Sequence, residues 1–372
     1  MARFGDIVYR ANTREDRFNT KKKYYVGGEH ILSSELLVRD KGIIEGSTIG
    51  PMFYCGFNDG DVLFVTRNPH LKKSAQVTFN GICSEKTLVL RSIDENILLQ
   101  SYLPIIMQTD EFWNYCEDNK SGGVNYFINW STLAEYEFDL PSVEVQKSIC
   151  EKVWAAYRLK EAYQRLLNAT DEMVKSQFLE MFGNPMADSE SATKLKDNVT
   201  LVLGSTPKSK TEKYWNGSLP WITPAELTDD SFEVSNTERC ITMEGVASAN
   251  LTEMPAGTVL FSTRAPIGKT AITTVPMYCN QGFKNMICGE SINNVFLYYT
   301  LRLNKEYLQS LGTGTTFKEL SKAVIEKLSI KVPPIESQTQ FATIYRQADK
   351  SKFELRKAIS AIDEVIKSLI NG

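Results

Sequence analysis

The residues that first suggest chemistry are Gly268-Lys269-Thr270, near the end of the stretch VLFSTRAPIGKTAI over residues 259–272. A phosphate-binding loop has the pattern G-x-x-x-x-G-K-[ST], in which backbone amides surround the phosphates and the lysine reaches the terminal ones. The first glycine of that pattern should stand at position 263, where this chain has Thr263. Pro266 also removes one amide donor from the loop. The stretch therefore argues against a nucleotide site, although an enzyme that uses it stays open as an alternative.

An internal repeat accounts for most of this stretch. Residues 61–77, DVLFVTRNPHLKKSAQV, share with it Val-Leu-Phe, then Thr-Arg, then Pro, at a constant offset of 264 − 67 = 197. The Gly-Lys-Thr is missing from the earlier copy. What recurs is a strand followed by a Thr-Arg-x-Pro corner, and self-similarity at a fixed offset indicates duplicated structural units.

A second repeat predicts two long helices. The segment that begins at Pro141 aligns without a gap with the one that begins at Pro333, at an offset of 333 − 141 = 192. A proline followed by a glutamate suits the first turn of a helix, and apolar residues three and four apart then indicate a coiled-coil seam. The residues expected to pair the helices are Leu159, Tyr163, Leu167, Val174 and Phe178 in the first copy and Leu355, Ile359, Ile362, Ile366 and Leu369 in the second.

The order of these segments predicts the architecture. Short β-branched and aromatic runs between turn residues fill the remaining sequence, which is typical of α+β domains. We expect a globular domain over 1–140, a long helix over 141–183, a linker with a second globular domain over 184–332, and a second long helix over 333–372. If the helices pair, they form an antiparallel coiled coil with pseudo-twofold symmetry. The alternative is two ordinary amphipathic helices packed on different domains.

Composition narrows the function classes. Among the 372 residues there is no apolar run of membrane-spanning length and no charged-then-apolar leader, so we expect a cytoplasmic protein without a membrane partner. Seven scattered cysteines and two histidines argue against a disulfide framework and a metal site. A net charge of −3 disfavours a nucleic-acid binder. However, basic side chains gather with aromatic ones at Lys23-Tyr24-Tyr25 and again over residues 208–215.

A group of motifs in the second half points to one family. They are Gly204-Ser205-Thr206-Pro207, Tyr214-Trp215-Asn216-Gly217, Pro220-Trp221-Ile222-Thr223-Pro224, Gly312-Thr313-Gly314-Thr315 and the helix start Pro333-Pro334-Ile335-Glu336-x-Gln338. This set resembles the target-recognition domain of specificity (S) subunits of type I restriction-modification systems. The first half keeps the spacing of the repeat, since Glu29 matches Glu226 at an offset of 197 and Gly122 matches Gly314 at an offset of 192. It differs in the segment RANTREDRFNTKKKYYVGGEHI, so its similarity rests on the repeat.

The resemblance implies a non-catalytic DNA-recognition subunit. In that family two target-recognition domains each read one half of a bipartite, asymmetric double-stranded DNA target in the major groove. The paired helices set the spacer and bind two adenine-N6 methyltransferase (modification) subunits. S-adenosylmethionine would belong to those partners, and ATP and Mg to a restriction or translocase subunit if one joins, so no cofactor or metal is expected in this chain. Such systems serve DNA methylation and phage defence.

Candidate DNA contacts follow from charge and glycine content, because phosphate contacts supply affinity and base edges supply sequence choice. In the first domain they are Arg14, Arg17, Lys21, Lys22, Lys23, Tyr24, Lys72, Lys73, Gly122 and Gly123. In the second domain they are Gly204, Ser205, Thr206, Lys208, Lys210, Lys213, Tyr214, Gly314, Thr315, Thr316 and Lys318. Candidates for base contacts are Arg14, Arg17, Asn19 and Gln281. We expect Trp221 in the core, and Arg67 and Arg264, which recur in both halves, in structural or phosphate-binding roles.

Two rival functions remain. One is a coiled-coil adaptor that binds proteins and no DNA, which the sequence pI of about 5.7 supports. The other is an enzyme that uses the Gly268-Lys269-Thr270 stretch. A methyltransferase of this pathway would carry an Asn/Asp-Pro-Pro-aromatic segment, and Asn184-Pro185-Met186 breaks that pattern.

Overall fold

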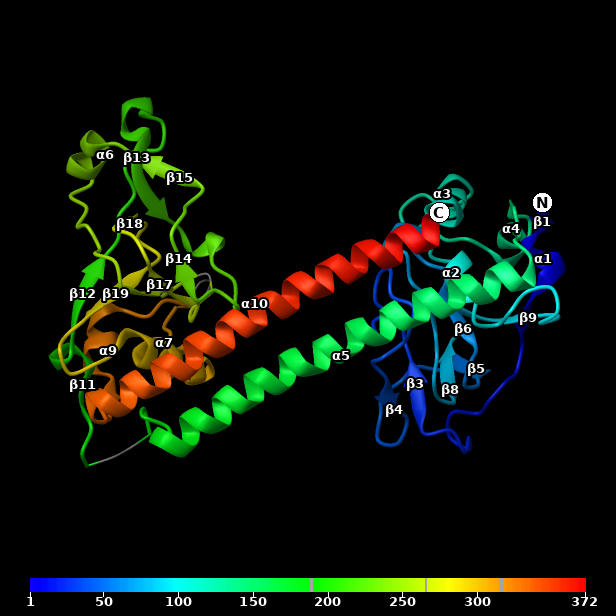
Figure 1. The fold of residues 1–372 in the computed structure, drawn as a ribbon, viewed down its shortest axis with the longest axis horizontal. Coiled ribbons are helices and arrows are strands. Elements are labelled where there is room, and N and C mark those ends of the chain that lie inside the picture. Colours follow the sequence, from blue (N-terminus) through cyan, green and yellow to red (C-terminus); the bar gives the residue numbers. More distant parts are fainter. Residues whose placement is uncertain (188–189, 265, 315–317) are drawn as a thin grey trace. The chain divides into compact units, whose positions relative to one another are not determined.

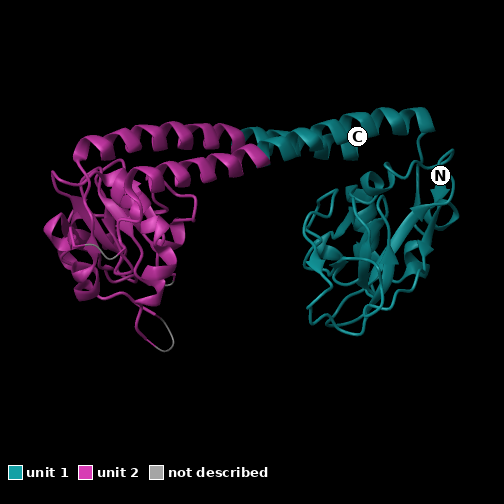
Figure 2. Cartoon of the chain, turned by 90° about the horizontal axis from the view of Figure 1, so that it is seen from below, with its two compact units in different colours: residues 1–164, 357–372 teal, residues 165–356 magenta. Residues whose placement is uncertain are grey.

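The computed structural model describes residues 1–187, 190–264, 266–314 and 318–372 (Figure 1). It divides into two compact units, unit 1 with residues 1–164 and 357–372, and unit 2 with residues 165–356 (Figure 2). Each unit contains a stretch of both long helices, whereas the sequence assigned the helices to segments of their own. Within the described residues, no helix combines the length and the hydropathy that crossing a membrane requires.

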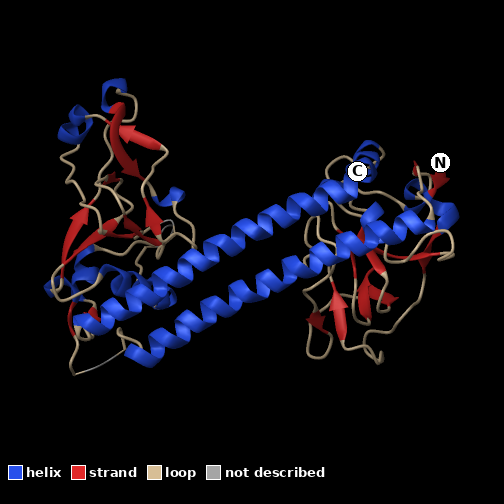
Figure 3. Ribbon diagram, viewed as in Figure 1, coloured by secondary structure: helices blue, strands red, loops and turns tan. Residues whose placement is uncertain are grey.

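Unit 1 contains two small sheets with helices around them (Figure 3). One sheet has the order β2 (Val8–Ala11), β9 (Thr87–Ser92), β6 (Val62–Val65), β7 (Ser74–Gln76), all antiparallel. The other has the order β4 (Gly42–Ile43), β3 (Tyr24–Val26), β8 (Gly81–Ser84), β5 (Phe53–Phe57). The remaining elements are the pair β1 (Ala2–Arg3) and β10 (Glu137–Phe138), and α1 (Phe4–Ile7), η1 (Pro69–Leu71), α2 (Leu103–Ile106), α3 (Asp110–Asp118) and α4 (Trp130–Leu133).

Unit 2 has the corresponding pair of sheets. One has the order β12 (Val199–Leu203), β19 (Lys284–Cys288), β16 (Val259–Phe261), β17 (Thr270–Thr273), β14 (Glu233–Val234). The other has the order β15 (Arg239–Ile241), β13 (Trp215–Ile222), β18 (Tyr278–Cys279). The remaining elements are the pair β11 (Thr193–Lys194) and β20 (Ser329–Ile330), the short turns η2 (Leu195–Asp197), η3 (Glu212–Tyr214) and η4 (Pro224–Glu226), and α6 (Met243–Ser248), α7 (Asn294–Leu303), α8 (Lys305–Ser310) and α9 (Lys322–Lys327).

The strand register confirms the internal repeat. In unit 1, β3 pairs in parallel with β8 and places Tyr24 opposite Gly81. In unit 2, β13 pairs in parallel with β18 and places Trp221 opposite Tyr278. Both partners are displaced by the same number, since 221 − 24 = 197 and 278 − 81 = 197. The duplication therefore extends into β3 and β13, where the two halves differ in their residues.

A buried glutamine fixes the start of the first long helix, α5 (Val143–Phe182). The side chain of Gln146 is fully buried. Its oxygen accepts from the amide of Leu99 at 3.0 Å, and its nitrogen donates to the carbonyls of Ile97 at 2.8 Å and Pro141 at 2.9 Å. Each polar atom of this side chain is therefore satisfied, as burial requires.

The second long helix, α10 (Ile335–Asn371), begins in the same way. Gln338 stands at the matching position, since 338 − 146 = 192, and it too is fully buried. Its oxygen accepts from the amide of Asn293 at 2.8 Å, and its nitrogen donates to the carbonyls of Ser291 at 3.0 Å and Pro333 at 2.7 Å. The glutamine shared by the two halves is therefore a structural anchor of each helix.

Both long helices contribute to the apolar core of each unit. In unit 1, Val153 and Tyr157 of α5 lie in one cluster with Ile366 of α10. In unit 2, Phe178 of α5 packs on Phe341 of α10, with ring centroids 4.9 Å apart. Burying an aromatic or aliphatic side chain of this size stabilises a fold by about 1.5–3 kcal/mol, so these contacts hold each helix to its globular sheets.

Most of the residues predicted to pair the helices are at least partly buried. Those with at most a tenth of their surface exposed are Leu167, Val174, Phe178 and Ile366. Those of intermediate exposure are Tyr163, Leu355, Ile359, Ile362 and Leu369. The prediction was wrong for Leu159, which is 45% exposed. The buried row of α5 runs through Val153, Tyr157 and the half-buried Lys160, so Leu159 lies on another face.

Two lysine–aspartate pairs join the helices with a reciprocal pattern. In unit 1, Lys160 of α5 pairs with Asp363 of α10 at 2.7 Å. In unit 2, Lys352 of α10 pairs with Asp171 of α5 at 2.8 Å. The positions correspond under the repeat, since 352 − 160 = 192 and 363 − 171 = 192.

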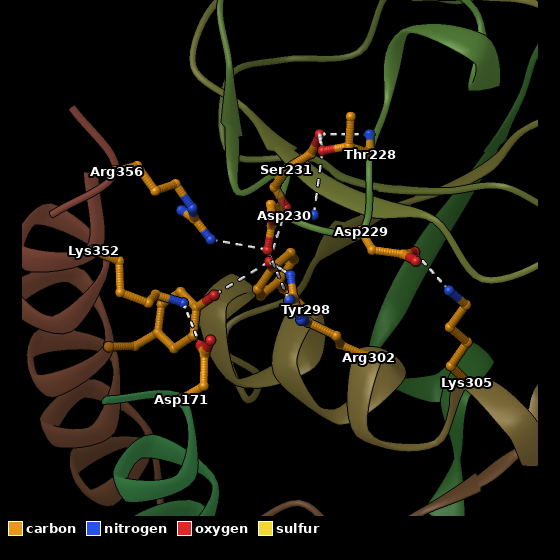
Figure 4. A network of polar contacts seen from close by, with 11 residues as sticks. Asp171, Thr228, Asp229, Asp230, Ser231, Tyr298, Arg302, Lys305, Lys352 and Arg356 are labelled. Atoms are coloured by element: carbon orange, nitrogen blue, oxygen red, sulfur yellow. Dashed lines mark hydrogen bonds and ion pairs between the residues drawn. The ribbon is translucent and has the colours of Figure 1, made fainter. Parts of the chain in front are cut away.

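A loop after β13 is tied to the helices of unit 2 by a polar network (Figure 4). Asp230 forms an ion pair with Arg356 of α10 at 2.9 Å. The hydroxyl of Tyr298 donates to the carbonyl of Ser231 at 2.8 Å. Lys305 pairs with Asp229 at 2.5 Å. These contacts fix the loop against α7, α8 and α10.

The loop after β3 in unit 1 is tied down by one carboxylate. Glu35 accepts from the hydroxyl of Tyr157 at 2.5 Å and pairs with Lys160 at 2.9 Å. Burial, together with this hydrogen bond to Glu35, raises the pKa of the Tyr157 hydroxyl. Lys160 therefore serves both the loop and the Lys160–Asp363 pair.

The pair in unit 2 predicts unequal effects of removing either partner. Lys352 is 3% exposed and Asp171 is exposed. Asp171→Asn leaves a buried ammonium without its counter-ion and should lower the free energy of unfolding by about 2–3 kcal/mol. Lys352→Met removes the charge and keeps the packing, so its cost should be below about 1 kcal/mol. Urea unfolding followed by circular dichroism measures both, and equal losses would show that the buried charge is not what matters.

Candidate nucleic-acid interface

In unit 2, the first candidate segment, residues 204–214, is held by hydrogen bonds from two tryptophans. The indole N–H of Trp221 donates to the carbonyl of Ser205 at 3.1 Å, and that of Trp215 donates to the carbonyl of Lys208 at 3.2 Å. Both rings are buried, with centroids 5.0 Å apart and planes at 81°. The core position expected for Trp221 is confirmed, and the tryptophans hold this segment through the backbone of Ser205 and Lys208. Pro207 is buried and Tyr214 packs against the tryptophan cluster, whereas the lysines at 208, 210 and 213 are exposed.

Gly204 is required at the base of this segment. A Cβ atom at this position would lie 1.8 Å from the carbonyl oxygen of Asn280. The amide of the next residue, Ser205, donates to the carbonyl of Cys279 at 3.0 Å. The glycine therefore serves close packing of the backbone on β18, and any DNA contact it makes comes through the main chain.

The lysines of the segment differ in availability. Lys208 and Lys210 are exposed, and neither has an ion pair within the part of the chain that the structure describes. Lys213 is exposed too but pairs with Glu244 at 3.1 Å. The hydroxyl of Thr206 donates to the side-chain oxygen of Gln281, which brings these two candidates together. Lys208 and Lys210 are the cations best placed to meet a phosphate.

The second candidate segment of unit 2 includes Gly314 and Lys318. Thr313 and Glu319 pair as an isolated bridge, and Gly314 has a φ of +123°, which favours glycine. Lys318 is exposed, whereas Thr315 and Thr316 lie outside the described residues. Lys284, which sequence reasoning missed, pairs with Glu319 at 2.8 Å. The hydrogen bond from Lys284 lowers the pKa of the Glu319 carboxyl.

The Gly268-Lys269-Thr270 stretch belongs to the hairpin between β16 and β17. The ammonium of Lys269 donates to the carbonyl of Pro224 at 2.9 Å, and Thr270 is buried in β17. Gly268 has a φ of +101°, which a tight turn requires. The lysine therefore serves to join this hairpin to the turn at residues 224–226.

In unit 1, several candidate cations surround exposed aromatic rings. The guanidinium of Arg17 lies 4.4 Å from the ring centroid of Phe18, which is 80% exposed. That of Arg14 lies 5.0 Å from the ring of Tyr54. Arg17, Phe18 and Lys23 line a hollow of about 570 Å³ together with residues 44–49. Lys21 is exposed beside it, and Tyr24 is half-buried.

Three lysines of unit 1 are engaged inside the protein. Lys22 donates to the carbonyl of Phe57 at 2.8 Å, and Lys73 donates to the carbonyl of Gly28 at 2.5 Å. Lys72 pairs with Asp110 at 3.2 Å. The structure argues against Lys22 and Lys73 as DNA contacts, because their ammonium groups satisfy backbone oxygens.

The second candidate segment of unit 1 also lies next to an isolated bridge. Ser121 and Phe127 pair as an isolated bridge, which places Gly122, with a φ of +100°, and Gly123 at the exposed tip. The guanidinium of Arg67 lies 5.4 Å from the ring of Phe127. In unit 2, Arg264 forms a bridge with Glu319. The repeated arginines thus lie beside Phe127 and Glu319, and their structural or phosphate-binding role stays a prediction.

Sequence reasoning missed two further cations. The guanidinium of Arg239 lies 3.6 Å from the ring centroid of Trp215, and the ammonium of Lys41 lies 4.1 Å from that of Tyr24. Both side chains are exposed, with Arg239 on the edge strand β15 and Lys41 directly before the edge strand β4. No sequence signal could have found them, because the pairing of distant strands brings each cation to its ring. Asn19, by contrast, donates to Asp16 at 2.7 Å and so supports its own turn.

The family model for the "Type I restriction modification DNA specificity domain" matches residues 189–363. The match covers 175 of the 372 residues, since 363 − 189 + 1 = 175. A curated relative, the MjaIX type I restriction enzyme specificity subunit of Methanocaldococcus jannaschii, is 38% identical over 182 residues. That match covers 48% of this chain and 42% of the relative, so the chain aligns with less than half the length of this relative.

Solved structures share the fold of the whole chain. The type I S subunit from M. genitalium matches with a TM-score of 0.62 at 14% identity, over 99% of this chain and 94% of that one. A chain from a structure on complex assembly and conformational transition of the type I R-M system matches with a TM-score of 0.54 at 21% identity, over 99% and 95%. The similarity to S subunits therefore includes the first half, outside the matched specificity domain.

The packing of Gly204 gives a prediction on stability. Gly204→Ala places a methyl group against a main-chain carbonyl that cannot rotate away, so the free energy of unfolding should fall by about 2 kcal/mol. Gly123→Ala is the matched control, because nothing lies within 4 Å of a Cβ there, and its effect should stay within about 0.5 kcal/mol. Urea unfolding of the two variants checks this, and a Gly204→Ala protein as stable as the parent would contradict it.

Proposed function

We propose that this chain is a non-catalytic DNA-specificity subunit in which unit 1 and unit 2 each read one half of a bipartite, asymmetric target. The observation that carries the proposal is a common frame with different exposed side chains. Tyr24 and Trp221 hold equivalent register positions. Yet the neighbouring segments offer Arg14 and Arg17 in unit 1, and Lys208 and Lys210 in unit 2. Recognition of two different half-sites requires two domains with the same fold and different exposed side chains.

The long helices are proposed to pair as an antiparallel coiled coil with pseudo-twofold symmetry and to set the spacer. The reciprocal pairs Lys160–Asp363 and Lys352–Asp171 support this, because polar contacts within an apolar seam fix the register of two helices. The 40 residues of α5 correspond to about 60 Å of helix, more than the 34–36 Å that separates half-sites one DNA turn apart.

A second apolar row on α5 is the proposed docking face for the methyltransferase. Leu159, Leu166 and Met173 recur every seven residues and are 45%, 52% and 49% exposed. Alanines at positions 162 and 169 lie between them. An exposed heptad row of this kind fits the helices of a partner, and we assign it to the modification subunit, which would supply S-adenosylmethionine. A restriction subunit would supply ATP and Mg.

Exchanging one recognition domain tests the two-reader proposal. A chain whose residues 192–332 come from another specificity subunit should methylate a target changed in one half, because unit 1 keeps its own contacts. Single-molecule sequencing of methyladenine in cells that carry the complex measures this. Changes in both halves would contradict the proposal. A protein-binding adaptor would leave no methylation target, and its complexes would lack the steep weakening with salt that phosphate contacts cause.

Charged substitutions in this exposed row should weaken binding of the methyltransferase subunit. Leu166→Glu with Met173→Glu places two charges in the proposed helix contact, so co-purification of the methyltransferase subunit should fall at least about tenfold. Phe353→Glu is the matched control, since Phe353 is 60% exposed on α10, which does not carry the row. Pull-down at fixed concentration, with circular dichroism to show that both variants fold, measures the effect. Undiminished binding by the double variant would rule out this face.

A further inference from the structure

The edge strand β15 carries an arginine on the tryptophan pair of unit 2. The guanidinium carbon of Arg239 lies 3.6 Å from the ring centroid of Trp215 and 5.5 Å from that of Trp221. A cation this close to an indole face is held by electrostatic attraction and by stacking of two planar groups. The arginine is therefore fixed in place before any ligand arrives.

The same rings hold the segment at residues 204–214. Trp215 and Trp221 donate to the carbonyls of Lys208 and Ser205. Arg239 is consequently fixed relative to Lys208, although the two are far apart in the sequence. The backbone of Lys208 and the guanidinium of Arg239 therefore share Trp215 as a common support.

The donors of Arg239 remain available. Stacking uses the face of the guanidinium, whereas its N–H groups point outward in the plane. The side chain is exposed, and within the described ranges it has no ion pair. The nearby carboxylate of Glu226 is occupied by the amides of Thr223 and Glu238, at 2.7 Å and 2.8 Å. A planar fork with free donors matches the O6 and N7 acceptors of guanine.

Unit 1 has a cation beside the corresponding ring, although Ile43, not Lys41, lies opposite Tyr24 as Arg239 lies opposite Trp221. Tyr24 corresponds to Trp221, and β4 pairs with β3 as β15 pairs with β13. Immediately before β4, Lys41 has its ammonium 4.1 Å from the ring of Tyr24 and 4.3 Å from that of Phe79. Both units thus place an exposed cation on aromatic rings, on the edge strand β15 in unit 2 and directly before the edge strand β4 in unit 1. The residue type differs, as it should where two readers accept different bases.

We propose that Arg239 reads the major-groove edge of a guanine in the half-site of unit 2, through paired hydrogen bonds to O6 and N7. The inference rests on the proposed function and names one of its specificity-determining residues. It assigns the base contact to the edge strand, while Lys208 and Lys210 contact phosphates.

The test uses the complex of the full chain with its methyltransferase subunits and duplexes that carry its methylated target. Each guanine of the second half-site is replaced in turn by 7-deazaguanine, which lacks the N7 acceptor. At one guanine the parent complex should lose about 10-fold in affinity, as expected when a paired contact is broken. The affinity of Arg239→Ala for the unmodified duplex should be about 10- to 100-fold lower than that of the parent. The 7-deaza substitution at that guanine should not change the affinity of this variant.

Two further variants keep the result interpretable. Arg239→Lys retains the charge and a cation–π contact but lacks the planar fork, so it should bind nonspecific DNA like the parent and lose discrimination at that guanine. Arg346→Ala removes the same charge at an exposed site on α10, paired with Glu233, and should leave discrimination unchanged.

The outcomes separate the two proposals. If the parent complex binds its target and Arg239→Ala weakens all duplexes equally, with a smaller salt slope, Arg239 contacts phosphate and the inference fails. It fails also if no guanine of the second half-site responds to 7-deaza substitution. If the parent complex binds no DNA, the proposed function itself fails.

Discussion

The burial of one face of each long helix in two separate cores is the constraint on which the rest of the structure depends. The early turns of α5 bury Val153 and Tyr157 in unit 1, and its late turns bury Val174 and Phe178 in unit 2. α10 does the same in the opposite order, with Phe341 in unit 2 and Ile366 in unit 1. The hydrophobic contribution to stability scales with the apolar area removed from water. An insertion or deletion within either helix is therefore tolerated only if the same helix face stays buried in both cores.

Polar groups in these cores specify register more than they add stability. Gln146 and Gln338 each satisfy three backbone groups where a helix begins, so a shift by one residue would leave buried donors and acceptors unpaired, at a cost of about 1–3 kcal/mol each. The nearly buried Lys352 has a similar effect. Its ion pair with Asp171 offsets the desolvation of the ammonium without a large net gain, and it makes other helix alignments unfavourable. The internal repeat keeps these residues because they define the geometry shared by both halves.

The surfaces that differ between the halves rest on this shared frame. In unit 2 the segment at 204–214 depends on the indole N–H groups of Trp215 and Trp221. In unit 1 the corresponding position, Tyr24, has a smaller ring, which packs edge-on against Phe79. Since the supporting strands keep their register, the exposed side chains can change without disturbing the core. This separation of frame from contact surface is the physical basis for domains that differ in what they bind and agree in how they fold.

The sequence by itself determined the duplication, the two long helices and the α+β character of the domains, because these depend on periodicity and on residues that repeat at fixed offsets. It also placed Trp221 in the core. It could not distinguish Lys208, whose ammonium is exposed, from Lys22 and Lys73, whose ammonium groups bind backbone carbonyls. Leu159 fitted the apolar spacing and yet lies outside the buried row. Only the tertiary structure decided which cations meet solvent and which rings support Arg239 and Lys41, because those contacts join strands distant in the sequence, and local pattern carries no information on such pairings.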